Sequence, residues 1–151
     1  MKRPLIISFS NYLMGFIICC LLIESAGCGK YDDGPKFSLR SKKERLSNKW
    51  RIEKYMQDGS DKTDQFNTLY KSYQFEIVKS GAYQLSYDSL GKVLSDEGTW
   101  RFKAGDNTTI EYLSNKNGAL IKRFHILRLK EKELWYYMEE NSVRSEFHMK
   151  P

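Results

Sequence analysis

Few residues in this chain of 151 residues could do chemistry: three cysteines and two histidines stand out. Cys19 and Cys20 lie inside an apolar run, whereas Cys28 directly follows three small residues, as near the cleavage site of an exported chain. Glu146 and His148 are two residues apart on an expected strand, so both could face one metal ion. Two ligands do not complete a metal site, and a solvated or packed histidine is the simpler interpretation. We therefore expect no catalytic, cofactor or metal site, and no enzyme.

Residues 1–27 predict a signal peptide. Lys2 and Arg3 give a positively charged start, and Tyr12–Ile23 is an apolar run. A run of this length fits the apolar core of a secretory signal and is shorter than the ~20 residues of a transmembrane helix. We expect cleavage between Gly27 and Cys28; the alternative is an uncleaved anchor helix.

The segment Ser25-Ala26-Gly27-Cys28 resembles the lipobox of bacterial lipoproteins, although Ser25 stands where Leu is usual. In that family the Cys thiol receives a diacylglyceryl group, and cleavage makes this Cys the new N-terminus. The resemblance implies that Cys28 is lipidated and anchors the protein in the outer membrane, facing the periplasm or the cell surface. Two or more acyl chains give firm anchoring. The alternative is an ordinary signal peptide followed by a free Cys28.

Residues 28–37 are expected to form a lipidated tether, because Gly34 and Pro35 favour a turn. Lys30 with the acidic pair Asp32 and Asp33 resembles the surface-export signal of Bacteroidota-type lipoproteins, and a solvated linker is the alternative. Removal of residues 1–27 leaves 23 basic and 18 acidic residues, a net charge of +5. Export makes nucleic acid an improbable partner, so we expect anionic lipid headgroups or another envelope polyanion near the anchor.

Residues 38–151 predict one all-β domain. A short helix over Ser38–Leu46 is expected first, since Ser41 is followed by Glu44 three residues on, as in a capping box. Alternating apolar residues and turn signals then predict about eight antiparallel strands. Their cores are Trp50–Met56, Tyr73–Ile77, Tyr83–Tyr87, Trp100–Phe102, Ile110–Tyr112, Leu120–Leu129, Leu134–Met138 and Val143–Met149. Strands joined in order favour an up-and-down barrel, with a sandwich as the alternative.

Three details of these strands are predicted. Trp50, Ile52, Lys54 and Met56 are expected to share one face of the first strand. The apolar parity slips between Ile126 and Leu127, which predicts a bulge. The segment Gln57–Tyr70 is long for a hairpin connection and is expected to form a lid or a short helix.

The run Tyr31–Pro35, followed by Ser38–Lys43 and Trp50, resembles the start of lipocalin-like lipoproteins of Bacteroidota. In lipocalins a short helix or turn leads into a Gly-x-Trp motif on the first strand, and the Trp closes one end of the barrel. Here Trp50 is present and the Gly is replaced by Asn48. The resemblance implies that Trp50 closes a barrel end and that a late-strand arginine, Arg128 or Arg144, covers it.

The aromatic residues, 14% of the chain, are the remaining functional signal. An eight-strand barrel is either filled by side chains or holds one small ligand. The expected inward-facing residues that would line such a ligand are Tyr73, Phe75, Tyr83, Leu85, Trp100, Phe102, Tyr112 and Tyr136. The predicted function is non-catalytic binding of a small hydrophobic or lipid-like ligand. The alternative is a filled barrel that acts as a protein-interaction or envelope-structural module.

A modification is also expected on one turn. Asp88-Ser89-Leu90 resembles the acceptor of periplasmic O-glycosylation in the same bacterial group, so Ser89 is a candidate acceptor.

Overall fold

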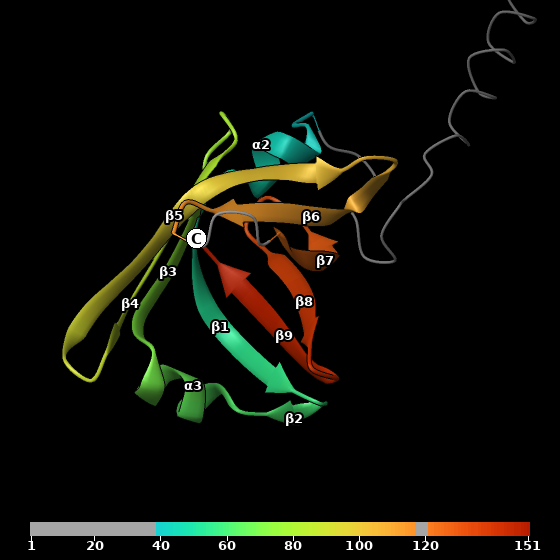
Figure 1. Ribbon diagram of the computed structural model, residues 1–151. Helices are drawn as coiled ribbons and strands as arrows, with labels where there is room; N and C mark the ends of the chain where they lie inside the picture. Colours follow the sequence, from blue (N-terminus) through green and yellow to red (C-terminus); the bar gives the residue numbers. More distant parts are fainter. Residues whose placement is uncertain (1–38, 117–120) are drawn as a thin grey trace, which may run out of the picture.

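The alternating strands close into an antiparallel barrel (Figure 1). The computed structural model describes residues 39–116 and 121–151; the expected signal peptide and tether, residues 1–37, lie outside them. The elements are α2 (Lys42–Leu46), β1 (Lys49–Gln57), β2 (Ser60–Asp61), α3 (Thr63–Leu69), β3 (Lys71–Ile77), β4 (Ala82–Ser89), β5 (Lys92–Lys103), β6 (Asp106–Ser114), β7 (Ile121–Leu129), β8 (Leu134–Glu140) and β9 (Val143–Lys150).

Each strand from β3 to β8 pairs with the next along the chain, β3 pairs with β1, and β1 pairs with β9. This last pairing closes an eight-strand ring, to which the two-residue β2 is added as a hairpin beside β1. The predicted all-β up-and-down barrel is therefore confirmed, and the sandwich is excluded.

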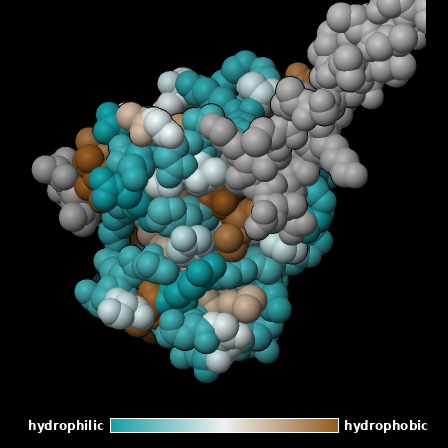
Figure 2. Space-filling model, turned by 90° about the vertical axis from the view of Figure 1, so that its right-hand side faces the viewer, coloured by the Kyte–Doolittle hydropathy of each residue, from teal (hydrophilic) through white to brown (hydrophobic). Residues whose placement is uncertain are grey.

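The barrel has two different ends (Figure 1). The end drawn at the top carries α2 and the β5–β6 turn, and we call it the upper end. The end drawn at the bottom carries α3, β2 and the β8–β9 turn, and we call it the lower end. Most of the face in Figure 2 is hydrophilic, with hydrophobic side chains in small patches only, as expected for a barrel wall that faces water.

The upper end is closed by α2 and the start of β1. The predicted capping box is present: the Glu44 backbone N–H donates to Ser41 Oγ at 3.2 Å, and the Ser41 N–H donates to Glu44 Oε2 at 2.9 Å. Leu46 and Trp50 are completely buried. The Trp50 Nε1–H donates to the Leu46 carbonyl oxygen at 2.8 Å, so the indole ties the end of the helix to the first strand.

The prediction that one face of β1 holds Trp50, Ile52, Lys54 and Met56 is correct for Trp50 and Ile52. It is wrong for Lys54 and Met56. Ile52 pairs with Met149, but the register shifts before Lys54, which pairs with His148. This bulge turns Lys54 outward to an ion pair with Asp61 and turns Tyr55 inward against Phe147.

A second register shift lies between Ile126 and Arg128 in the pairing of β7 with β8. It returns Leu129 to the buried face after Ile126, and both side chains belong to the core. The bulge predicted from the parity slip is confirmed.

The interior is packed mostly with rings in its middle and lower half. Phe124 lies at the centre, with its ring centroid 4.5 Å from that of Tyr136, 6.1 Å from Tyr112 and 6.2 Å from Phe75. The Tyr136 ring in turn stacks on Phe147 at 4.8 Å. Burial of rings this large, together with their mutual contacts, supplies much of the stability of a small barrel.

Gly98 lets two strands approach closely at the barrel wall. A Cβ atom at this position would lie 1.9 Å from the Leu113 carbonyl oxygen on β6 and 3.0 Å from Cε1 of Tyr83 on β4. Tyr83 is the cross-strand partner of Gly98, so its ring lies over the missing side chain.

Loss of the indole hydrogen bond at the upper end is expected to destabilise the barrel. Trp50→Phe leaves the buried Leu46 carbonyl without its donor, and we expect the free energy of unfolding to fall by about 2 kcal/mol. Urea unfolding measures this change. Trp135→Phe is the control, because Trp135 Nε1 has no hydrogen-bond partner and its loss should cost clearly less. Equal effects of the two substitutions would contradict the role of the Trp50 bond.

The capping box predicts a pH dependence of stability. Hydrogen bonds from Lys79 and Ser41 lower the pKa of Glu44 from 4.5 to about 2. A carboxylate whose pKa is lowered by folding stabilises the fold above its unfolded pKa, and this contribution is lost as the pH falls towards the folded pKa. We therefore expect Glu44→Gln to be less stable than the parent at pH 6, with most of this difference lost at pH 2. Thermal unfolding across this range is the measurement, with exposed Glu97→Gln as the control. A stability difference that persists unchanged at pH 2 would contradict the lowered pKa of Glu44 in the folded protein.

Candidate functional site

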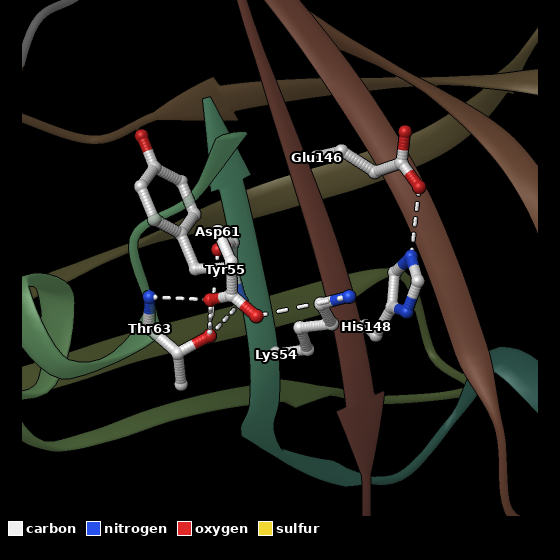
Figure 3. A network of polar contacts seen from close by, with 6 residues as sticks. All are labelled: Lys54, Tyr55, Asp61, Thr63, Glu146 and His148. Carbon is white, nitrogen blue, oxygen red and sulfur yellow. Dashed lines mark hydrogen bonds and ion pairs between the residues drawn. The ribbon is translucent and has the colours of Figure 1, made fainter. Parts of the chain in front are cut away.

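The segment Gln57–Tyr70 lies across the lower end of the barrel (Figure 1). The predicted short helix is confirmed as α3, and β2 precedes it. Figure 3 shows how this segment is tied to β1. Asp61 accepts hydrogen bonds from the Thr63 N–H at 3.0 Å and from the Thr63 hydroxyl at 2.7 Å, and the Tyr55 N–H donates to Thr63 Oγ1 at 3.0 Å. These Thr63 hydrogen bonds lower the pKa of the Asp61 carboxyl.

One buried side chain attaches α3 to the interior. Phe66 is the buried residue of this helix, and the other helical side chains are exposed or half-buried. Its ring centroid lies 4.7 Å from those of Tyr55 and Tyr70, 5.2 Å from Tyr73 and 5.9 Å from Phe147. An element held by one apolar anchor opens at lower free energy than the strands do.

Below the central rings, tyrosine hydroxyls gather inside the barrel. Tyr73 and Tyr136 form a side-chain hydrogen bond, and burial raises the pKa of both phenols above 10.0. Burial also raises the pKa of Tyr112, whose hydroxyl lies 4.0 Å from the Met138 sulfur. All three phenols are therefore neutral at physiological pH and keep a proton that they can donate.

A carboxylate reaches into the same region from β5. Asp96 accepts from the Tyr83 hydroxyl at 2.9 Å through Oδ2 and from the Ser114 hydroxyl at 2.5 Å through Oδ1. Burial, and then the hydrogen bond to Asp96, raise the pKa of Tyr83. The sequence prediction missed Asp96, Ser114 and Met138, because it collected mainly aromatic residues. Their parity could have found them, since Asp96 shares a face with Trp100, Ser114 with Tyr112, and Met138 with Tyr136.

Two cavities open at the lower end. One of about 360 Å³ lies at the rim of β8 and β9, and its lining includes Met138, Glu140 and Phe147. The other, of about 370 Å³, lies between β7 and β8 and also includes Met138 and Glu140. The β7–β8 pairing begins only at His125 with Tyr137, so the strands separate below that pair. The two cavities therefore adjoin at Met138, next to the Tyr112 hydroxyl.

All eight residues expected to line a ligand lie in the core cluster of the barrel, four of them buried and four partly buried. Trp100 belongs to the upper part, since its Nε1–H donates to the Val78 carbonyl beyond the end of β3. The lower cluster of tyrosine hydroxyls consists of Tyr73, Tyr112 and Tyr136. The buried candidates are Phe75, Tyr83, Trp100 and Tyr136, and the partly buried ones are Tyr73, Leu85, Phe102 and Tyr112.

The two arginines expected near Trp50 separate to different ends. Arg144 lies over the Tyr137 ring at 3.9 Å, near the lower end of β9, whereas Trp50 is at the upper end of β1. Arg128 lies over the Trp135 ring at 4.5 Å, beside Leu129 and towards the end that holds Trp50. The strand register thus excludes Arg144 as a cover for Trp50 and leaves Arg128.

The remaining sequence candidates lie on the outer face or outside the described residues. Glu146 and His148 face outward, with Glu146 Oε1 and His148 Nε2 2.7 Å apart (Figure 3). The His148 ring stacks on Trp135 at 4.1 Å. Ser89 ends β4 beside an exposed turn, and its glycosylation stays a prediction. Gly27 and Cys28 lie outside the described residues. Residues 39–116 and 121–151 contain no group of three or more side chains suited to a metal ion.

Comparison with known proteins names no relative. No protein-family model matches the chain, and a search of curated proteins gives no match. Within residues 39–116 and 121–151, no helix combines the length and the apolar character needed to cross a membrane.

Proposed function

We propose that this protein is a lipid-anchored lipoprotein of the bacterial outer membrane whose barrel binds one small, mainly apolar ligand and catalyses no reaction. The observation that supports ligand binding best is the cluster of Tyr73, Tyr112 and Tyr136, whose hydroxyls lie inside the barrel near the two lower cavities. The anchor rests on the lipobox at Cys28, and the ligand site rests on the barrel interior.

A cluster of tyrosine hydroxyls is unusual inside a barrel that is merely filled. Buried hydroxyls are normally hydrogen-bonded, and a filled core is built more cheaply from Phe and Leu. The Tyr112 hydroxyl has the Met138 thioether as its partner, and sulfur is a weak acceptor. A ligand with a carbonyl or ether oxygen would give this hydroxyl a stronger acceptor, while the surrounding rings would cover an apolar body.

Helix α3 is suited to act as the lid of this site. Ligand pockets are typically ~300 Å³ or larger, and Phe66 now occupies the space between Tyr55, Tyr73 and Phe147. Displacement of Phe66 would join the lower interior to the rim cavities. We therefore propose that the ligand enters at the lower end and that α3 moves outward as it binds.

A second candidate is a filled barrel that acts as an interaction module. Direct ring contacts across the centre, from Phe75 through Phe124 to Tyr136, favour it. The β4–β5 hairpin also exposes Leu90 and Val93, by 98% and 79%. Exposed apolar side chains on a protruding turn are typical of contact surfaces.

Native mass spectrometry of the protein purified from its own envelope tests the ligand site, with lipid extraction to identify what is bound. We expect a bound small molecule, and we expect Tyr112→Phe to lower its occupancy by about fivefold at limiting ligand, since a buried hydrogen bond contributes about 1 kcal/mol. Tyr137→Phe, on the outer face of β8, is the matched control. Parent protein that is consistently free of ligand would reject binding and favour the filled module.

Replacement of the anchor residue tests the localisation. Cys28→Ala removes the thiol that carries the lipid, so we expect loss of label from radioactive palmitate and release of the protein from the membrane fraction. Cys20→Ala is the control, because Cys20 lies in the expected signal peptide and should leave labelling intact. Unchanged labelling and fractionation of Cys28→Ala would disprove the lipid anchor.

A further inference from the structure

A groove of about 520 Å³ lies on the outer wall of the barrel, across β5, β6 and β7. Its apolar lining includes Leu113 and Ile121, which pair directly with each other. Its polar lining includes Arg101 and Glu111, which face each other across the β5–β6 pair. The groove thus joins an apolar strip to a charged strip.

One buried carboxylate organises the charged strip. Glu111 is only 8% exposed, although it lies on the outer wall. Its Oε2 accepts from Arg101 Nε at 3.0 Å and pairs with Nη2 at 2.9 Å, and its Oε1 accepts from Arg123 Nε at 3.0 Å. Hydrogen bonds from Arg123 and Arg101 lower the pKa of Glu111, so the carboxylate stays charged.

The two guanidinium groups carry more charge than Glu111 neutralises. Arg101, Glu111 and Arg123 together have a net charge of +1, and the side chains of Arg101 and Arg123 are 71% and 52% exposed. A guanidinium has five N–H donors in a rigid plane, and Glu111 uses only some of them on each arginine. Its bonds hold both planes in place, so little side-chain entropy remains to be lost when an anion binds.

We propose that this groove binds one molecule of a single-chain anionic amphiphile, with its carboxylate or phosphate head on the exposed N–H groups of Arg101, while Arg123, on the other side of Glu111, adds to the positive charge. The apolar chain lies along Leu113 and Ile121 on the outer wall. Ile121 is 40% exposed in the described structure, and the chain would cover it. Both the charge and the volume of the groove fit such a ligand, since small-molecule pockets are typically ~300–1,000 Å³.

This site is separate from the proposed ligand site inside the barrel. The arginines lie on the outer wall, whereas the Tyr112 hydroxyl is directed inward to Met138. Either site can therefore exist without the other, and substitutions distinguish them.

Titration of laurate, below its micelle concentration, into the full mature protein in phosphatidylcholine nanodiscs tests the proposal. Calorimetry, corrected with empty nanodiscs, gives the affinity. We expect laurate to bind one-to-one, and dodecyltrimethylammonium, which has the opposite charge, not to bind. Arg101→Gln with Arg123→Gln should weaken laurate binding at least tenfold. Arg51→Gln, an exposed arginine on β1, is the matched control, and Tyr73→Phe, inside the barrel, should leave the affinity unchanged.

Ile121→Asp provides an independent variant, since it places a negative charge on the apolar strip at an exposed position. It should weaken laurate binding to a similar extent, and it keeps the test decisive if the double arginine variant does not fold.

Three outcomes would overturn the proposal. The first is equal laurate affinity in the parent and in the arginine variant. The second is binding to phosphatidylglycerol vesicles without binding of laurate, which would make the arginines a flat headgroup-binding patch. The third is laurate binding that is observed only in the variant Asp32→Asn with Asp33→Asn. This result would mean that the acidic pair of the chain's own tether competes for the groove.

Discussion

The pairing of β1 with β9 is the constraint on which the rest of the structure depends. The two strands are the first and the last of the ring, and their pairing runs from Arg51 with Lys150 to Gln57 with Ser145. Without it the sheet would have two exposed edges, which invite pairing with other chains. With it the apolar face becomes an interior, and only the two ends remain to be closed. That is the task of α2 with Trp50 above and of α3 with Phe66 below.

The bulge in this pairing decides which residues meet at the lower end. Because the register shifts between Ile52 and Lys54, Tyr55 enters the interior and supports Phe66 and Phe147. The same shift sends Lys54 outward to Asp61, whose other bonds hold Thr63 at the start of α3. One irregular position in β1 thus positions both the inner support and the outer attachment of the helix that covers the lower end.

The sequence was sufficient for the strands and their order, because apolar alternation and turn residues are local signals. It predicted the β7–β8 bulge, since a run of apolar residues made the parity slip visible at Leu127. It failed at β1, because Lys54 and Tyr55 both have long side chains that suit either face. It also missed Asp96, Ser114 and Met138, whose importance comes from partners on other strands. The lower cavities depend on where β7 and β8 separate, and no single segment encodes that point.

The two halves of the barrel interior differ in how well their polar atoms are satisfied. In the upper half, the indoles of Trp50 and Trp100 both donate to backbone carbonyl oxygens, so their polar atoms are satisfied within the protein. The lower half contains phenols with raised pKa, a weakly satisfied Tyr112 hydroxyl and a covering helix with one anchor. A fully buried hydroxyl without a partner costs about 1–3 kcal/mol, and a partly buried one with a weak partner costs less; a core selected for stability alone would still replace Tyr112 with Phe. The position of this polar group at the end that α3 covers is the physical reason why we propose a binding protein and not a filled module.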